Sequence, residues 1–266
     1  GQSSEIAFDS RAQILWWTDL ATQKVAALKV KESQPVAPFF PNGNSSMDPI
    51  LDLLNVNGVS YVATQTGFVQ GFNGNISDVF TYQSQAGFKV DQIYPVSNRI
   101  IVRETDGQGL NQRFRYLFTN GLVNSQFSSN DQIIGFGARA SREDGAFQFL
   151  KEGQEMQVRE YDLNSGQSNF FIQKLNFDFD HLIQIREYEY IFYNQSTVVT
   201  YNLSTNFVRT LASALNDPVV AYNEADESVF VASENNLSIY DYSQGNLIIN
   251  FSASFPIVDL AIRYNK

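Results

Sequence analysis

The stretch Pro-Ile-Val-Asp-Leu-Ala-Ile at residues 256–262 repeats the stretch Pro-Ile-Leu-Asp-Leu-Leu-Asn at residues 49–55. The stretch at residues 256–262 resembles the first strand of an internal repeat. It lies near the end of the chain, however, and no further strands of a repeat follow it. It has a use if the repeats form a ring, because the last strand can then join the first repeat and leave no free edge. The two stretches therefore predict a ring of β-repeats, a β-propeller.

The N-terminal segment supports this closure. Residues 228–253 align with residues 5–30 at a constant offset and without a gap, so that Ile239 falls on Trp16 and Phe251 on Leu28. The N-terminal segment thus matches the second, third and fourth strands of the preceding repeat and lacks the first. Residues 256–263 supply it in this register, as the innermost strand of the first blade.

A rival register makes residues 5–9 a first strand. In this register, Trp-Trp-Thr-Asp at residues 16–19 resembles the Tyr-Trp-Thr-Asp motif of receptor propellers. This register leaves the C-terminal segment with nothing to pair with, and the motif occurs once. Closure by the C-terminal strand is therefore the register that the sequence favours.

The whole chain, residues 1–266, is predicted to be a single all-β domain. Runs rich in β-branched and aromatic residues alternate with short polar turns, and four such runs recur roughly every 40 residues, as in propeller blades. Six four-stranded antiparallel blades account for the chain. Their expected ranges are 256–263 with 4–30, then 49–82, 88–127, 131–174, 180–212 and 217–252.

The longest expected connector covers residues 31–48. It contains Pro35, Pro38, Pro41 and a Ser-rich stretch, and proline cannot continue a central strand. We expect a loop on one face of the ring, either a plain insertion or a lid over a binding surface.

Composition excludes several classes of function. The net charge is −10, and no basic cluster occurs, which opposes a nucleic-acid partner. No window is long and apolar enough to span a membrane. The chain has 22 Phe and 13 Tyr but no Cys, so disulfides and thiolate sites cannot occur. The polar start after Gly1 resembles a mature chain whose export signal has been removed, so we expect an exported bacterial protein, in the periplasm or cell envelope, and a monomer.

Four similar turns fall between the third and fourth strands. They begin Asp-Leu at residue 19, Asp-Leu at 162, Asn-Leu at 202 and Asp-Tyr at 241. These turns resemble the Asp-Leu-x-Thr-Gly turn of many propeller families, WD40-like and quinoprotein-like among them, a resemblance that implies a fold and no function. The spacing of Asp162, Asn164 and Gly166 also suits a calcium loop, but no downstream Glu completes one. Side chains that cap tight turns explain these residues better.

No catalytic constellation is visible. His181 is the only histidine, so a histidine zinc cluster is excluded, and a Ser-His-Asp triad would need that same residue. No phosphate-binding glycine loop occurs. We interpret His181 as a structural residue at the start of a strand, and we name no catalytic residue.

The first strands carry an acidic set. Asp52, Asp91 and Asp259 occupy one equivalent position in three of them, and Gln184 occupies it in a fourth. Carboxylates on neighbouring inner strands would raise one another's pKa or recruit a hard cation such as calcium. The arrangement resembles calcium-dependent six-bladed lactonases, which hold a metal in the channel, although their Glu and Asn ligands have no counterpart in these strands. The alternative is that each Asp caps a loop or accepts a bond from a backbone N–H.

Two functions are compatible with these observations. The favoured one is a non-catalytic propeller whose loop face binds a protein, peptide or glycan, without a cofactor. The other is a propeller hydrolase or lyase with a carboxylate or cation site in the channel. The candidate ligand-binding residues of the ring are Asp52, Asp91, Asp259 and Gln184. Fold alone does not decide between them.

Overall fold

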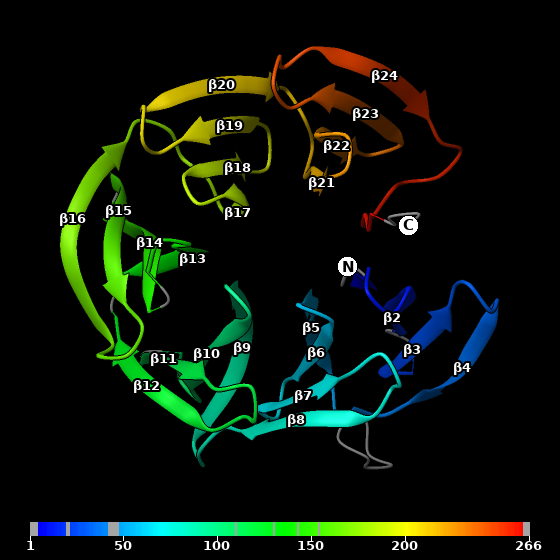
Figure 1. Cartoon of the computed structure of the whole chain (residues 1–266), viewed down its shortest axis with the longest axis vertical. Coiled ribbons are helices and arrows are strands. Elements are labelled where there is room, and N and C mark those ends of the chain that lie inside the picture. The colour runs from blue at the N-terminus through cyan, green and yellow to red at the C-terminus, as the bar shows by residue number, and fades with distance from the viewer. Residues whose placement is uncertain are drawn as a thin grey trace.

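The chain forms a ring of six β-sheets (Figure 1), here seen in a computed structural model. The structure describes residues 5–19, 22–41, 48–109, 111–129, 131–142, 144–153 and 155–262. These residues form strands and turns with no helix, and hence no helix that could cross a membrane. Each sheet has four antiparallel strands that follow one another in the chain. The predicted six-bladed propeller is thus confirmed.

Each blade takes its four strands in chain order, from the channel outward (Figure 1). Blades one to three comprise β1 (Ile6–Asp9), β2 (Ile14–Asp19), β3 (Lys24–Lys29), β4 (Gln34–Phe39), β5 (Ile50–Val56), β6 (Val59–Thr64), β7 (Phe68–Phe72), β8 (Asp78–Gln83), β9 (Phe88–Val96), β10 (Arg99–Asp106), β11 (Gln112–Leu117) and β12 (Val123–Ser128). Blades four to six comprise β13 (Gln132–Ala138), β14 (Gly145–Glu152), β15 (Glu155–Asp162), β16 (Gln167–Leu175), β17 (His181–Arg186), β18 (Glu189–Tyr193), β19 (Val198–Asn202), β20 (Phe207–Ala212), β21 (Val219–Asn223), β22 (Ser228–Ser233), β23 (Asn236–Asp241) and β24 (Leu247–Ser252).

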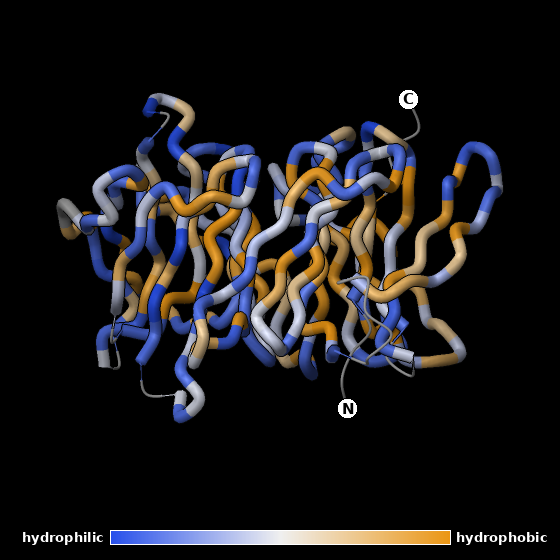
Figure 2. Tube along the Cα trace, turned by 90° about the horizontal axis from the view of Figure 1, so that it is seen from below, coloured by the Kyte–Doolittle hydropathy of each residue, from blue (hydrophilic) through white to orange (hydrophobic). Residues whose placement is uncertain are grey.

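The core lies between blades. Alternate side chains of a strand point to opposite faces of its sheet, so a blade with two neighbours buries both faces. Five clusters of buried apolar residues fill the junctions between consecutive blades, from one–two to five–six. Figure 2 shows the result: hydrophobic residues run through the body of the ring, and hydrophilic turns border both faces. Aromatic rings bridge the layers, as Trp16 of blade one does with Phe72 of blade two, at 5.7 Å between centroids.

A buried charge also ties two blades together. The Glu104 side chain on β10 is completely buried and pairs with Arg113 and Arg115 of the next strand. The Tyr82 hydroxyl, on β8 of blade two, donates to the same carboxylate. Because the carboxylate has several charged and polar donors, its burial is compensated, as a buried ion requires.

The predicted composition of blade one is wrong. Its first strand is β1, Ile6–Asp9, which pairs antiparallel with β2, so the rival register holds. Its fourth strand, β4, lies where a loop was expected. Pro35 and Pro38 are tolerated there because β4 is the outermost strand and has a free edge that needs no donors. Of the expected long loop, residues 42–47 lie outside the described residues.

The C-terminal segment, residues 253–262, follows β24 without forming a strand. The backbone N–H groups of Ala253 and Ile257 donate to the turn between β22 and β23, at Asn235 (2.7 Å) and Glu234 (2.8 Å). Figure 1 shows the segment then running inward, between blade six and blade one. It therefore reaches blade one as a neighbour and not as its innermost strand; Arg263 lies outside the described residues.

The recurrent Asp or Asn turns behave as caps. The Asp162 carboxylate accepts from the backbone N–H groups of Asn164 (3.0 Å) and Ser165 (2.8 Å). Asn202 accepts in the same way from Ser204 and Thr205, and Asp241 accepts from Gln244. The bonds that Asp162 accepts lower its pKa, and the backbone N–H of Ser165 has the largest effect. The capping interpretation accounts for these side chains, because the backbone donors occupy their oxygens.

Candidate functional site

The inner strands enclose a cavity of about 610 Å³ in the channel. Its walls come mainly from β5, β9, β13 and β17, the first strands of blades two to five, with Tyr193 added from the end of β18. Both polar and apolar side chains line it, among them Asp52, Tyr94, Leu182, Ile183, Gln184 and Tyr193. A cavity of this size and mixed lining is within the range of sites that hold a small ligand or a peptide side chain.

Asp52 on β5 lines this cavity and bonds to the next blade. Its carboxylate accepts from the backbone N–H of Ile93 on β9, at 3.1 Å. Burial raises the pKa of Asp52 to about 6, against the opposing effect of the Ile93 and Leu53 N–H groups. The carboxylate therefore acts mainly as a staple between the inner strands of blades two and three.

Gln184 on β17 makes the corresponding connection between blades four and five. Its side-chain oxygen accepts from the backbone N–H of Ala138 on β13, and its amide nitrogen donates to the carbonyl of Ala138, both at 2.7 Å. The amide thus satisfies both backbone groups of one residue, as a strand partner would. Few polar atoms of Gln184 remain for a ligand.

Asp91 is neutralised within its own blade. Its carboxylate pairs with the Arg103 guanidinium on β10 at 2.7 Å, and Arg103 also donates to the Tyr94 hydroxyl at 3.2 Å. Tyr94 lines the cavity, whereas Asp91 does not. An arginine this close cancels the negative charge that a cation site would need.

Asp259 staples the C-terminal segment to blade one. Its carboxylate accepts from the backbone N–H of Ile6 on β1 at 2.7 Å. Burial raises the pKa of Asp259, while the N–H groups of Ile6 and Leu260 oppose that rise. The equivalence of Asp52 and Asp259 that the sequence indicated is real in one respect, since each bonds the first strand of the following blade.

The structure does not bring the whole predicted acidic arc together at the cavity. Asp52 and Gln184 lie at the cavity, Asp91 and Asp259 do not, and three of the four bond backbone groups of a neighbouring element. No group of three His, Asp or Glu side chains that could hold a metal occurs among the described residues. The described residues therefore do not bring an acidic ligand set together, and calcium stays a prediction from the sequence.

His181, interpreted from the sequence as a structural residue, lines the cavity. Its ring stacks on Tyr193, with 4.8 Å between centroids, and both rings line the cavity. Desolvation lowers the pKa of His181, although Asp180 and Asp217 oppose this. The imidazole is thus neutral at pH 7, and with Tyr193 it forms a flat aromatic surface at the start of β17.

Tyr94 and Arg103 are site residues that the sequence did not predict. The signal for Arg103 is a charged residue inside the apolar strand Arg-Ile-Ile-Val-Arg at residues 99–103, since such a residue needs a partner on the neighbouring strand. Tyr94 lies in a first strand three residues after Asp91. Aromatic residues are so common in this chain that nothing in the sequence distinguishes it.

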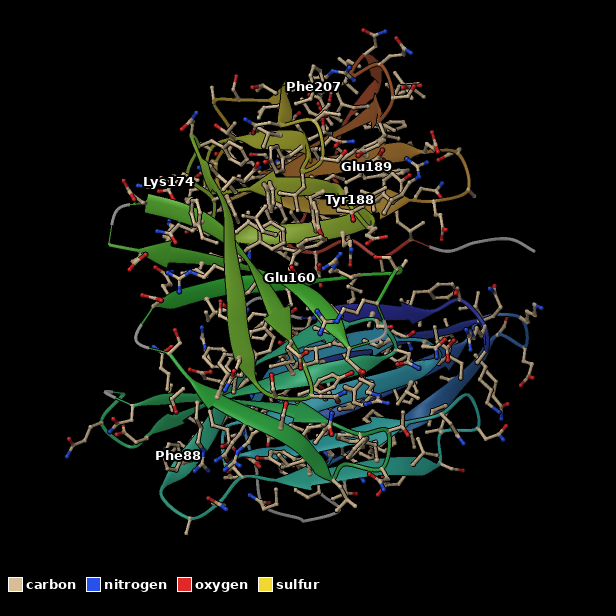
Figure 3. The ribbon with its side chains drawn as sticks, turned by 60° about the vertical axis from the view of Figure 1, so that its left-hand side comes forward. Phe88, Glu160, Lys174, Tyr188, Glu189 and Phe207 are labelled. Carbon is tan, nitrogen blue, oxygen red and sulfur yellow. The ribbon has the colours of Figure 1, made fainter. Side chains whose placement is uncertain are left out.

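A second, smaller hollow of about 220 Å³ lies at the outer part of blades five and six. Figure 3 labels Glu189 and Phe207, which line it from blade five. Its charges satisfy one another, because Arg186 pairs with both Glu189 and Glu227, and the Tyr242 hydroxyl donates to Glu189 at 3.3 Å. The hollow is therefore a self-neutralised junction and a weaker candidate than the channel.

Solved propeller structures resemble this chain in fold. A chain of a mitotic checkpoint complex matches with a TM-score of 0.68 and 10% identity, over 97% of this chain and 80% of that chain. The β-propeller domain of Cps50 (Swd1) from Myceliophteria thermophila matches with a TM-score of 0.68 and 11% identity, over 98% of this chain and 90% of that one. At such identities the likeness concerns the fold alone. No protein-family profile and no curated protein sequence matches the chain.

Proposed function

We propose that this propeller is a non-catalytic binding module that takes a segment of a partner protein at its channel. The observation that carries the proposal is the state of the polar groups around the 610 Å³ cavity. Asp52 and Gln184 are committed to bonds between blades, which leaves an aromatic and aliphatic surface with few free polar groups. Such a surface recognises an apolar or aromatic side chain by burying it.

Catalysis would need more than this cavity offers. Asp52 is the one carboxylate and His181 the one histidine among the described residues that line it. A general acid and a nucleophile must both reach the reacting atoms, and a glycosidase needs a pair of carboxyl groups. One of the solved structures with a similar fold is a chain of a protein complex. This agrees with a protein partner for the present chain.

A phage-displayed library of random peptides tests the proposal. Pro95, an exposed residue at the cavity, is changed to Arg so that a long cation fills the entrance. Peptides enriched on the unchanged protein should lose at least about tenfold in affinity for Pro95→Arg, measured by fluorescence anisotropy, because burying an unpaired charge is costly.

The matched control is Val123→Arg, which places the same charge on exposed β12 of the same blade. It should leave the affinity unchanged. Peptides that bind both variants as well as the original protein would show that the channel is not the binding site.

A further inference from the structure

The junction between blade six and blade one, here called the seam, differs from the other five junctions. Each of those five contains a cluster of buried apolar residues. Among the described residues, no such cluster joins blade six to blade one. The C-terminal segment, residues 253–262, enters the ring at this point (Figure 1).

Blade six turns an apolar face to the seam. Phe230, Ile239 and Ile249 form one row across β22, β23 and β24 by their strand pairing. The opposite face of the same sheet, with Val229 and Val231, is buried against blade five. Phe230 and Ile239 are only half-buried and Ile249 is 44% exposed, so this face lacks the cover that the other one has.

Blade one turns a second apolar face to the seam. Ile6 pairs with Trp17 and Phe8 with Leu15 across β1 and β2, and all four are half-buried. The residues of blade three that correspond to Trp17 and Leu15 are Val102 and Ile100 on β10. Their side chains are 0% and 1% exposed. Strands β6 to β8 of blade two cover them.

The C-terminal segment stands in the place of a first strand ahead of blade one. Asp52 of β5 accepts from Ile93, which pairs with Val102 in the next blade. Asp259 accepts from Ile6, which pairs with Trp17 in the same way. Residues 256–262 also repeat residues 49–55, which contain all of β5 except its last residue. The segment therefore lies beside the first strand of blade one in the way that β5 lies beside the first strand of blade three.

We propose that the seam is a docking site for three antiparallel strands of a partner protein, which complete a seventh blade on the C-terminal segment. The segment has no strand partner on either side among the described residues. A sheet that pairs with its backbone would lie between two apolar walls, so it must be apolar on both faces, as β6 to β8 are. Strand addition to a free edge is a common way to bind a polypeptide, and here pairing would combine with burial.

Three further apolar side chains, which follow the apolar face of blade six in the chain, also support a partner at the seam. Phe251, Phe255 and Val258 are 50%, 67% and 54% exposed. They follow one another from β24 into the C-terminal segment and border the seam. A cluster of large exposed apolar residues on one edge of a protein marks an interaction surface.

A synthetic peptide with the sequence of residues 57–84 of this chain is a suitable probe. It contains β6 to β8, the strands that fold onto the stretch that residues 256–262 repeat. Labelled peptide should bind the full chain, and Ile239→Asp combined with Ile249→Asp should weaken binding at least about tenfold, because two charges would be buried in the seam. Val208→Asp, on an exposed site of β20, should leave binding unchanged.

Two outcomes would overturn the proposal. One is absence of binding at about 100 µM peptide, a concentration at which even a weak specific strand addition is detectable. The other is binding that the seam variant does not affect. Light scattering on the chain alone adds a third test: a dimer that the seam variant dissociates would assign the site to a second copy instead.

The geometry of the free protein can be measured independently of the peptide. The chain has no cysteine, so spin labels can be placed on Gln34→Cys and Asn250→Cys alone, on the outermost strands that flank the seam. The distance between the labels should agree with the structure and stay the same when the peptide binds. A shorter distance in the free protein would mean that blades six and one close on each other, and the proposal would fail.

Discussion

At the residue scale, the inner strands are held to one another by single side chains. The side chains of Asp52, Gln184 and Asp259 each accept a hydrogen bond from a backbone N–H of the first strand of a neighbouring blade. Strands of different blades run too far apart to pair by backbone, so a short polar side chain bridges them. For Asp52 this has a cost, because its charge is desolvated at the cavity.

Asp52→Asn should stabilise the protein at neutral pH. The pKa of Asp52 is about 6 in the folded chain, against 3.8 for the free side chain, so the folded state binds the proton more tightly. The wild type therefore loses stability as pH rises from about 4 to 6, by up to about 3 kcal/mol, and this loss persists above pH 6. Asparagine keeps the acceptor for Ile93 and removes the charge.

Chemical denaturation at several pH values checks this expectation. The variant should exceed the wild type at pH 7.5, and the two should converge below about pH 4, where Asp52 is protonated in both states. Asp91→Asn is the matched control, and it should be destabilising at pH 7.5 because Arg103 loses its partner. An Asp52→Asn protein that is less stable at pH 7.5 would contradict the argument.

At the element scale, β1 takes the innermost place in blade one that the sequence suggested for the C-terminal segment. Residues 5–9 resemble a second strand by alignment, yet Ile6–Asp9 is first in its sheet because the short turn to β2 lets the two pair at once. A local hairpin costs less chain entropy to close than pairing with residues about 250 positions away. The C-terminal segment then takes the neighbouring place.

Removal of residues 256–266 should leave a folded protein. Every blade keeps its four strands, so unfolding should remain cooperative. The loss of the Asp259 bond to Ile6 and of the Ile257 bond to Glu234 should cost about 1–3 kcal/mol, a fall of several degrees in Tm by calorimetry. Aggregation or loss of cooperative unfolding would instead support the segment as a strand of blade one.

At the scale of the whole molecule, the ring is packed unevenly. Among the described residues, apolar clusters fill five junctions, whereas one side of blade six lacks such a cluster and β24 is exposed along its length. Strands β19 and β23 are equivalent third strands, yet β19 is almost entirely buried whereas β23 is not. Stability should fall from the central blades toward the seam.

Amide hydrogen exchange should reveal this gradient. Amides of β23 should exchange at least about tenfold faster than those of β19, since fewer apolar contacts oppose local opening of blade six. Mass spectrometry of peptic fragments that cover each strand provides the measurement. Equal protection of the two strands would indicate that the seam is covered in the free protein.

The sequence alone determined the repeat: its period, the polar turns, the Asp and Asn caps, and thus six blades of four strands. These features depend on chemistry within a few residues, so they can be recognised without knowledge of the rest of the chain. The equivalence of residues 49–55 and 256–262 was also visible, since it is a matter of residue types. The prolines of β4 predicted a loop because proline excludes a central strand, but it does not exclude an outermost one.

Only the tertiary structure decided where the C-terminal segment lies and what the inner carboxylates do. A first-strand pattern does not specify which blade it serves, because every blade offers a similar inner edge. The direction of an Asp side chain likewise depends on which donor the ring brings near it: the Ile93 N–H for Asp52, the Arg103 guanidinium for Asp91, the Ile6 N–H for Asp259. These donors are 12 to 253 residues away in the chain. Strand pairing within blade three brings Arg103 to Asp91, and the arrangement of neighbouring elements around the ring brings the N–H groups to Asp52 and Asp259.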